Sequence, residues 1–515
     1  ALLTMAWLVA GFTPFIFIAF VPLYLLTTKS ISKLTFTVLI YTAMLIWNGG
    51  TTWWIWNATA EGAIGAILAN SLLMTLPWLA FFSLRSYVTN RMANLALIVF
   101  WMSFEYLHLQ DWGLSWPWLT LGNVFAEQTE WIQWYEYTGS SGGTLWVLVS
   151  NLAAFTIIHK RSHWKNYFAS SEMHRFLAVM ILPLVISKLM FSERTIPYGA
   201  ANVIIVQPKV DPYREKFAAG TQSEQIAKLI RLTESLTDSA TQLVVWPETA
   251  IPVQVWEDEL TTNHYYAPIW EFIKAHPQIS ILSGIDSYRK VAENEMNDFS
   301  TRNPDGTTLY YKAYNTAALL SADNQFQLYH KSKLVPGVES LPGWLNWMGR
   351  LFEQFGGISG TLATDKERRI LAQKNGFKIA PAICYESIYG EFLTSYVRNG
   401  ANIIGVITND GWWGNTPGYK QHMNYARLRA IETRRWIVRS ANTGISCFIT
   451  PSGKVLQPQG WWKEAAIKMH VPVSNELSFY VRYGDLISKA AVALTFMIIL
   501  LGIYNKRKAT KQTSL

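Results

Sequence analysis

Long apolar runs near both ends of the chain constrain its fold more than any other feature. Six lie in the first part, near 2–27, 34–56, 62–83, 92–109, 141–158 and 175–192, and a seventh lies near 487–504. About 20 apolar residues are enough for a helix to cross the hydrocarbon core of a bilayer. The runs therefore predict a bundle of transmembrane helices, and the alternative is a set of buried helices in a soluble core. Charged residues make up only 15% of the chain, which favours a surface that faces lipid.

The first apolar run differs from the others because it is interrupted. It contains Gly-Phe-Thr-Pro at 11–14, which predicts a break into two shorter helices, since proline removes a backbone donor from a helix. No charged segment precedes the run and no small-residue cleavage site follows it. We therefore do not expect a signal peptide at this position.

The loops between the runs alternate in their content of basic residues. Lys and Arg gather near 29–33, 85–91 and 159–175 and in the tail, whereas the loops at 57–61 and 110–140 are poor in them. Cytoplasmic loops of membrane proteins carry the excess of Lys and Arg. The alternation therefore predicts that the large middle part of the chain lies on the non-cytoplasmic side and that the basic tail returns to the cytoplasm.

From about residue 200 to 475 the pattern changes to short β-rich runs that alternate with polar helical stretches. Examples of the β-rich runs are Asn202–Val206, Leu243–Val245 and Asn402–Ile407. Strands that alternate with helices predict a layered α/β domain. We expect N-terminal transmembrane helices at 1–195, a non-cytoplasmic α/β domain at 196–480, a C-terminal transmembrane helix at 481–505 and a basic cytoplasmic tail at 506–515.

Net charge and cysteine content argue against several classes of function. The net charge is +9, but the basic residues cluster beside apolar runs, which fits membrane topology better than a nucleic-acid-binding face. The two cysteines, Cys384 and Cys447, belong to no CxxC pair, and no histidine cluster has zinc-ligand spacing. We therefore expect no nucleic-acid partner, no metal and no cofactor, and we expect Cys447 to be a buried core residue.

Three segments of the α/β domain carry reactive side chains. Glu248 follows an apolar strand, Lys331 lies in Tyr-His-Lys eight residues before Glu339, and Cys384 ends another apolar strand. A thiol attacks as its thiolate, a nearby carboxylate can take its proton, and a lysine can stabilise an oxyanion. Taken singly, each pattern is also typical of a buried cysteine, a turn glutamate or a surface lysine.

The order and spacing of these segments resemble the nitrilase (carbon–nitrogen hydrolase) superfamily, in which Glu, Lys and Cys follow one another along the chain. Lys331, and not Lys333, matches the Tyr-x-Lys position of that superfamily. The apolar helices on both sides make the chain similar to the apolipoprotein N-acyltransferase family in particular, over nearly its whole length, and Thr408–Gly414 and Arg439–Ile445 extend the similarity. The resemblance implies an α-helical transmembrane bundle joined to an α/β nitrilase-like domain, an αββα layered sandwich.

The same resemblance implies an N-acyltransferase that works in two steps. Cys384, with Glu248 as general base, would attack a phospholipid ester and keep the fatty acyl chain as a thioester. The α-amine of the N-terminal diacylglyceryl-cysteine of an apolipoprotein would then take the chain, in the final step of lipoprotein maturation. Lys331 and the N–H of Tyr385 would stabilise the oxyanion. We expect a monomer in the bacterial inner membrane, with the catalytic domain in the periplasm and the bilayer as its surroundings.

Three supporting positions also match the family. Glu339 would position Lys331 or Glu248, Glu386 would act beside the nucleophile, and Trp412 would lie at the mouth of the pocket. The chain departs from the family where Gly-Val, at 337–338, replaces the common Phe-Gly. An aromatic residue that often follows the first strand has no clear match, and Tyr213 is only a candidate substitute.

The aromatic stretch within 341–360 fits two interpretations equally, a lid that dips into the membrane interface or an ordinary core helix. Two other functions fit part of the sequence. One is a membrane-tethered amidase with the same triad. The other is a transporter or receptor with a ligand-binding domain, for which Glu105 within an apolar run is the main candidate residue. A tether needs only one helix, so the number of apolar runs favours the acyltransferase.

Overall fold

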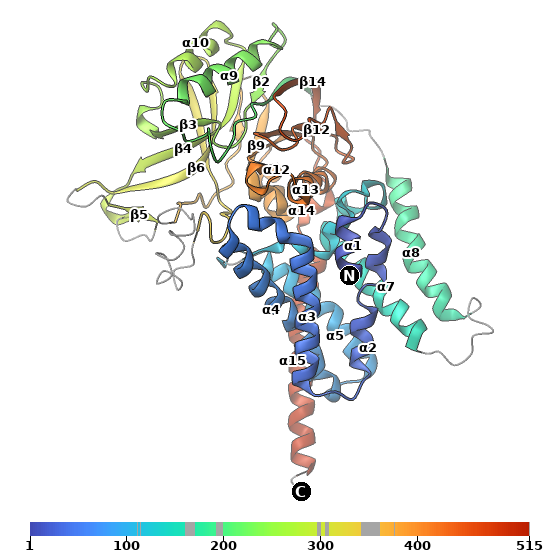
Figure 1. Cartoon of the computed structure of the whole chain (residues 1–515). Helices are drawn as coiled ribbons and strands as arrows, with labels where there is room; N and C mark the ends of the chain where they lie inside the picture. Colours follow the sequence, from blue (N-terminus) through green and yellow to red (C-terminus); the bar gives the residue numbers. More distant parts are fainter. Residues whose placement is uncertain are drawn as a thin grey trace. The chain divides into compact units, whose positions relative to one another are not determined.

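The chain forms two compact units. The computed structural model describes residues 1–110, 112–113, 115–159, 170–191, 199–295, 300–303, 308–340, 361–374 and 376–513. The helical unit contains Ala1–Trp56, Glu61–Phe191 and Tyr483–Leu515, and the α/β unit contains Asn57–Ala60 and Ser192–Arg482 (Figure 1). The aromatic stretch at 341–360, predicted as either a lid or a core helix, lies outside the described residues.

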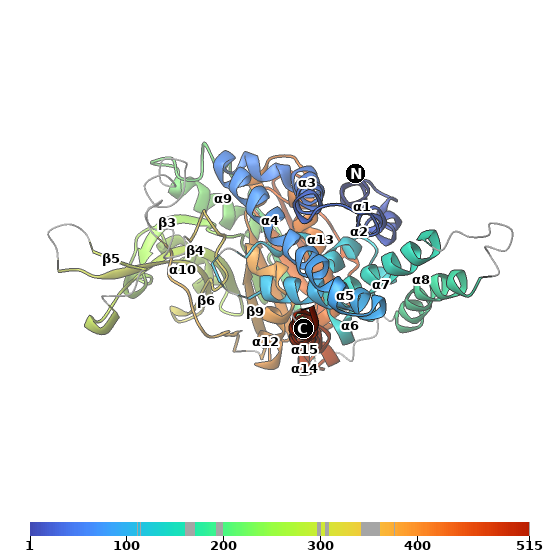
Figure 2. The same cartoon turned by 90° about the horizontal axis from the view of Figure 1, so that it is seen from below.

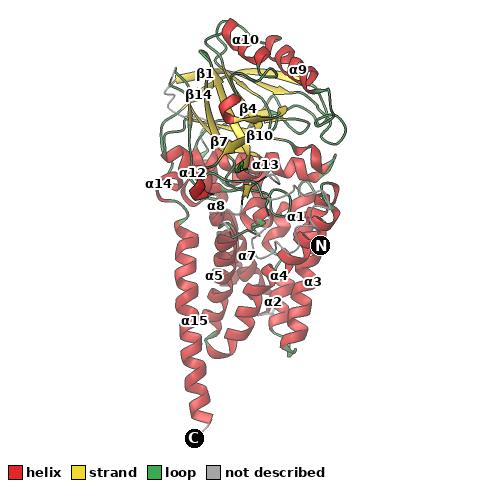
Figure 3. Cartoon of the chain, turned by 90° about the vertical axis from the view of Figure 1, so that its left-hand side faces the viewer, coloured by secondary structure: helices red, strands yellow, loops and turns green. Residues whose placement is uncertain are grey.

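The helical unit is built from helices and connecting loops, and every strand in the described part of the chain belongs to the α/β unit (Figure 3). Its α-helices are α1 (Leu2–Leu8), α2 (Val21–Thr27), α3 (Lys33–Thr52), α4 (Ala60–Leu84), α5 (Asn90–His108), α6 (Tyr135–Thr138), α7 (Ser140–His159), α8 (Ser171–Met190) and α15 (Leu486–Thr513). Short 3₁₀ helices join several of them: η1 (Thr13–Phe17), η2 (Trp53–Asn57), η3 (Arg85–Tyr87), η4 (Pro117–Leu119), η5 (Leu121–Ala126) and η6 (Thr129–Trp131). Helix α15 packs along α5, and α7 packs against both α5 and α8 (Figure 2).

Apolar helices at both ends of the chain confirm the predicted membrane bundle. Within the described ranges, five segments are long and apolar enough to cross a membrane: Lys33–Asn57, Ala60–Tyr87, Ser140–His159, Ser171–Met190 and Leu486–Gln512. Helix α5, which was expected to span as well, is not among these five. The predicted break in the first run is confirmed, because Gly11 has a φ of +81° and η1 separates α1 from α2.

Glu105 is a buried carboxylate in α5 and joins three elements of the helical unit. It accepts hydrogen bonds from Trp101 Nε1 (2.8 Å), the Leu121 backbone N–H (2.8 Å) and Thr144 Oγ1 (2.6 Å). These donors come from α5, η5 and α7. A buried carboxylate needs such partners, so its contacts are those of a residue that fixes helix packing.

Two sheets form the centre of the α/β unit. The first has the order β14-β1-β2-β4-β6-β5, with β3 paired to β4 and β7 paired to β6, and the second has the order β13-β12-β11-β10-β9-β8. The strands are β1 (Gly199–Gln207), β2 (Leu243–Val245), β3 (Ile251–Trp256), β4 (Ser280–Lys290), β5 (Thr301–Arg302), β6 (Tyr311–Ser321), β7 (Gln325–His330), β8 (Leu371–Ala372), β9 (Lys378–Ile383), β10 (Ile403–Thr408), β11 (Ile437–Ala441), β12 (Cys447–Ile449), β13 (Val455–Leu456) and β14 (Ala465–Val473).

Helices cover the outer face of each sheet. Helices α9 (Gln222–Glu234) and α10 (Ala267–Ala275) lie on the first sheet, and α12 (Gly390–Arg398) and α13 (Pro417–Thr433) lie on the second (Figure 1). The inner faces meet closely, because a Cβ atom on Gly405 of β10 would lie 2.6 Å from Leu282 Cδ2 of β4. This is the αββα sandwich that the sequence predicts. Cys447 is fully buried in β12, as expected.

Parallel strands at the centre of each sheet bring loop residues together at one edge. Strands β1, β2 and β4 are parallel, and so are β9, β10 and β11. Carboxyl ends of parallel strands meet at the same edge of a sheet, where α/β proteins place their ligands. Glu248 follows β2 of the first sheet and Cys384 follows β9 of the second. The two edges adjoin, because the backbone N–H of Asn409, which follows β10 of the second sheet, donates to the Glu248 carboxylate at 3.1 Å.

Candidate active site

Glu248 and Cys384 both follow a central strand and both lie in tight turns. The residue after Glu248, Thr249, has a φ of +44°, and Cys384 has a φ of +48°. The left-handed region costs a non-glycine residue about 1–2 kcal/mol, so both turns are held by their surroundings. Gly284 of β4 permits the first turn, because a Cβ atom there would lie 2.6 Å from the Glu248 Cα atom.

Lys331 links the two predicted carboxylates. Its ammonium nitrogen lies 3.2 Å from Glu248 Oε1 and 2.8 Å from Glu339 Oε1, and the lysine side chain is only 1% exposed. The amide of Asn315, on β6, donates to the same two oxygens at 2.8 and 3.1 Å. The second oxygen of Glu248 accepts the backbone N–H of Asn409 at 3.1 Å. The cluster is therefore buried, paired and fixed from several strands.

The charges of this cluster stabilise one another. Burial raises the pKa of Glu248, but Lys331, the Asn315 amide and Lys216 together hold it below its usual value. Burial lowers the pKa of Lys331, but Glu248 and Glu339 outweigh this and raise it well above the ordinary value. At neutral pH, Glu248 is therefore a carboxylate that can accept a proton and Lys331 is a fixed cation.

The charges of this cluster act on Cys384, whose thiol keeps its proton at rest. Burial raises the pKa of the thiol far above its usual value, the Glu248 charge raises it further, and Lys331 acts in the opposite direction. A thiol in this state needs a base at the moment of attack, and Glu248 is the carboxylate with the strongest influence on it.

Glu386 ties the turn at Cys384 to the segment after Lys331. One carboxylate oxygen accepts Tyr329 OH and the Ser332 backbone N–H, each at 2.6 Å, and the other accepts the Ile383 backbone N–H at 2.9 Å. Burial raises the pKa of Glu386, and these donors lower it part of the way. Its contacts are those of a residue that positions the nucleophile, because it joins β7 to the end of β9.

A second buried network contacts the backbone of Cys384. His422 Nε2 lies 3.1 Å from the Cys384 carbonyl oxygen and 2.9 Å from Ser387 Oγ. The Nδ1 atom of His422 lies 2.8 Å from Asp410 Oδ1, and Arg439 donates to the other Asp410 oxygen at 2.8 Å. Through this chain, α13 and β11 fix the backbone of Cys384.

Comparison with known proteins shows which family the chain belongs to. The family model for carbon-nitrogen hydrolase matches residues 205–475, more than half of the chain. The chain belongs to the carbon–nitrogen hydrolase family. A second model, the apolipoprotein N-acyltransferase N-terminal domain, matches residues 1–153. This pair of domains makes the chain an N-acyltransferase of the apolipoprotein N-acyltransferase type within the carbon–nitrogen hydrolases, as the sequence predicted.

Individual relatives share this arrangement over nearly their whole length. The apolipoprotein N-acyltransferase of Chlorobaculum tepidum is 28% identical, over 97% of this chain and 94% of the relative. That of Geobacter metallireducens is 26% identical, over 98% of this chain and 94% of the relative. Among solved structures, Saccharomyces cerevisiae Nit3 of the nitrilase superfamily is 16% identical, with a TM-score of 0.38 over 55% of this chain and 93% of Nit3.

The remaining residues that the carbon–nitrogen hydrolase resemblance singled out lie near the same strand ends. Tyr385 is buried against the ring of Tyr389 at 5.3 Å, and the role of its N–H stays a prediction. Trp412 is half-buried, its ring centroid lies 5.1 Å from that of Tyr213, and its carbonyl accepts Tyr213 OH at 2.7 Å. Tyr213, the candidate substitute aromatic, is therefore a neighbour of Trp412.

Sequence reasoning missed several residues of the site. Asn315 donates to the Glu248 carboxylate, and Asp410 and His422 contact each other in the network that holds the Cys384 backbone. Asn315 had no distinct signal, because β6 also contains Lys312, Thr316 and Ser321. Asp410 lies within the Thr408–Gly414 segment that matches the family. In the part of the chain that the structure describes, no group of three or more His, Cys, Asp or Glu side chains is arranged to hold a metal ion.

Proposed function

We propose that this N-acyltransferase moves a fatty acyl chain from a phospholipid to the α-amine of the diacylglyceryl-cysteine of an apolipoprotein, through a thioester on Cys384. The observation that carries the proposal is the buried, ion-paired cluster of Glu248, Lys331 and Glu339. Glu248 and Lys331 both act on the pKa of the buried Cys384 thiol, which directly follows β9. The N-terminal domain match of the chain to apolipoprotein N-acyltransferases supports a lipid donor and a lipoprotein acceptor.

In the first step, the Cys384 sulfur attacks the ester carbonyl of the phospholipid while Glu248 takes the thiol proton. An ammonium group has three N–H donors. Two of those on Lys331 bond Glu248 and Glu339, which leaves a third for the oxyanion together with the N–H of Tyr385. When the tetrahedral intermediate collapses, the C–O bond breaks, the lysophospholipid oxygen takes the proton from Glu248, and the acyl chain stays on sulfur.

In the second step, the α-amine of the lipoprotein attacks the thioester carbonyl. Glu248 accepts a proton from the attacking nitrogen, the C–S bond breaks, and the sulfur recovers its proton from Glu248. The amide product leaves the free thiol ready for another phospholipid. The same carboxylate therefore acts as base and then as acid in each half of a ping-pong reaction.

We further propose a bacterial inner-membrane location with the α/β unit in the periplasm. The support is the alternation of basic loops and the five apolar segments long enough to span. In this arrangement the domains are the transmembrane helices at 1–195, the periplasmic domain at 196–480, the last helix at 481–505 and the cytoplasmic tail at 506–515. We propose a monomer that binds no nucleic acid.

The test is acyl transfer by the purified full-length enzyme in phospholipid vesicles, with a diacylglyceryl-modified peptide as acceptor. We expect Cys384→Ala to abolish transfer. Cys447→Ala is the matched control, because Cys447 is also a buried cysteine but lies in β12 and contributes no hydrogen bond to the described cluster of Glu248, Lys331 and Glu339, and it should retain activity. Transfer that survives Cys384→Ala would overturn the proposal, and hydrolysis of small amides without transfer would favour a tethered amidase.

A further inference from the structure

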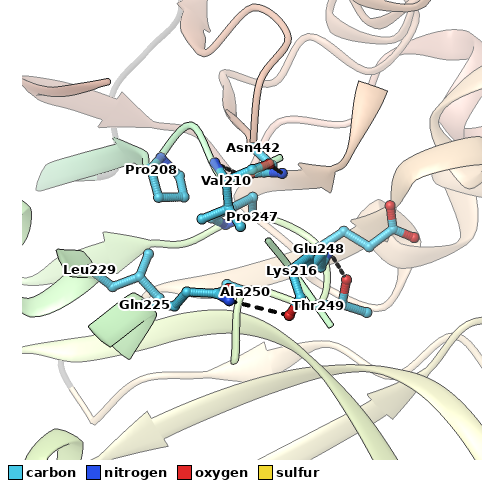
Figure 4. Close-up of a pocket in the computed structure, with 10 residues that line it drawn as sticks. All are labelled: Pro208, Val210, Lys216, Gln225, Leu229, Pro247, Glu248, Thr249, Ala250 and Asn442. Atoms are coloured by element: carbon cyan, nitrogen blue, oxygen red, sulfur yellow. Dashed lines mark hydrogen bonds between the residues drawn. The ribbon is translucent and has the colours of Figure 1, made fainter. Parts of the chain in front are cut away.

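Lys216 is a second buried lysine next to Glu248, and neither the sequence analysis nor the proposed mechanism uses it. It lies between β1 and α9 and is only 3% exposed. Its ammonium group donates to the Glu248 backbone carbonyl at 3.2 Å and to the hydroxyl of Thr249. Figure 4 shows Lys216 beside this turn, in a pocket from which the Glu248 carboxylate extends away.

The segment that carries Lys216 is itself fixed. Gln225 of α9 donates its side-chain amide to the backbone carbonyls of Lys216 at 3.2 Å and of Glu215 at 3.0 Å. The Lys216 backbone N–H bonds the Asp211 carbonyl at 2.9 Å. The backbone of Lys216 is therefore fixed by hydrogen bonds, and this fixes the position of its side chain beside the Glu248 turn.

The turn that Lys216 contacts is one of the two strained turns of the site. Thr249 has a φ of +44°, and Gly284 leaves room for the backbone at Glu248. Bonds to the Glu248 carbonyl and to the Thr249 hydroxyl on either side of the peptide hold this conformation in place. Because the direction of the Glu248 side chain depends on that backbone, the lysine also fixes where the carboxylate points.

Hydrogen bonds to two neutral acceptors do not by themselves explain why the charged ammonium group of Lys216 is buried. A neutral donor would satisfy a carbonyl and a hydroxyl without the cost of removing an ammonium group from water. Burial lowers the pKa of Lys216 to about 8, and the nearby acidic groups, Glu248 first and then Asp286 and the Cys384 thiol, act in the opposite direction. Lys216 in turn lowers the pKa of Glu248, in addition to Lys331. The two lysines therefore act on Glu248 from its backbone side and its carboxylate side.

We propose that Lys216 is a positioning residue for acyl transfer, which clamps the turn at Glu248 and whose charge keeps Glu248 ionised. The inference rests on the proposed function, because it assigns Lys216 to the general base of that reaction. It predicts that the charge of Lys216, and not only its bonds, sets the lowest pH at which Glu248 can accept the thiol proton.

The experiment measures the rate of acyl-thioester formation on the full-length enzyme, mixed with phospholipid vesicles, across about pH 5–9, the range in which general bases are usually tuned. Lys216→Met removes the charge, Lys216→Arg keeps it, and Lys216→Gln is a second neutral variant that keeps an N–H donor. Lys228→Met on α9 is the matched control, because it removes one positive charge from a partly exposed ion pair with Glu464.

The acid limb of the pH–rate profile is the range in which the rate of thioester formation falls as the pH decreases. We expect its midpoint to rise by about one pH unit in Lys216→Met and in Lys216→Gln. The plateau rate of Lys216→Met should also fall about tenfold or more as the turn loosens. Lys216→Arg should keep the acid limb of the unchanged enzyme, and Lys228→Met should behave as the unchanged enzyme does. A plateau that falls in the neutral variants without any movement of the acid limb would overturn the assigned role of the charge.

The failure of this inference is distinguishable from a failure of the proposed function. If the unchanged enzyme forms no adduct on Cys384 at any pH, the thioester mechanism is wrong. If it forms the adduct and all Lys216 variants match it in rate and in acid limb, the mechanism stands and Lys216 is no part of it.

Discussion

Replacing Glu386 by glutamine, Glu386→Gln, removes one negative charge from the α/β unit and almost nothing of the side-chain shape. The carboxylate accepts Tyr329 OH and the Ser332 N–H at 2.6 Å on one oxygen and the Ile383 N–H at 2.9 Å on the other. A glutamine has one accepting oxygen. We expect it to face Tyr329 and Ser332, so that the amide N–H₂ group opposes the N–H of Ile383.

The size of the effect follows from these contacts. A hydrogen bond to a charged acceptor contributes about 1.5–3 kcal/mol, and a buried donor left without an acceptor costs about 1–3 kcal/mol. Because these two contributions overlap at Ile383, we expect the free energy of unfolding to fall by about 2–4 kcal/mol. For a unit of this size that corresponds to a Tm lower by roughly 3–7 °C. Ile383 directly precedes Cys384, so thioester formation should also slow, by about 100-fold.

The assay is thermal unfolding of the purified enzyme in detergent, followed by tryptophan fluorescence, together with the rate of thioester formation. Glu234→Gln, at an exposed position of α9, is the matched control and should change neither quantity. An unchanged Tm with a lost rate would refute the positioning role of Glu386 and indicate that it acts on the reacting atoms. No change in either quantity would refute the reasoning from its hydrogen bonds.

Three further predictions concern other residues of the candidate active site. Asn315→Leu removes a 2.8 Å hydrogen bond from Glu248; its loss should raise the pKa of that carboxyl and move the acid limb of thioester formation up by about one to two pH units. Burial raises the pKa of Asp410, but Arg439 and His422 together outweigh it and hold the pKa below its usual value. The enzyme should therefore lose stability as pH falls below about 4, and Asp410→Asn should show a lower Tm at neutral pH and less acid sensitivity in thermal unfolding. Gly284→Ala places a Cβ atom 2.6 Å from the Glu248 Cα atom and should lower the rate about 100-fold without moving the acid limb, in the same pH–rate measurement.

The sequence carried enough information to predict the layers and the main charged residues. Apolar runs of about 20 residues predict membrane helices from length alone, and Gly11 marked the break in the first run, which the structure confirms. Glu248 and Cys384 could be predicted because the order and spacing of Glu, Lys and Cys resemble the carbon–nitrogen hydrolases. Cys384 directly follows β9, and Glu248 lies three residues after β2. Parallel strands then bring such residues to one edge of a sheet. Their catalytic roles remain predictions until activity is measured.

The supporting residues could not be predicted in the same way, because their partners depend on strand pairing. Asn315 reaches Glu248 only because β6 pairs with β4, with Asn315 opposite Asp286. Lys216 lies in a polar stretch that is typical of a solvated loop, and its burial depends on how the turn after β2 packs against that loop. The register of strand pairing and the packing of loops cannot be inferred from a single sequence, so these contacts could be identified only from the structure.

The central claim is that Cys384 carries the acyl chain between donor and acceptor. The direct measurement is peptide mass spectrometry of the full-length enzyme after incubation with phospholipid alone. We predict one fatty-acyl mass on the peptide that contains Cys384, its absence in Cys384→Ala, and its disappearance when the acceptor amine is added. Transfer to the acceptor with no acyl adduct on that peptide at any time would contradict the account.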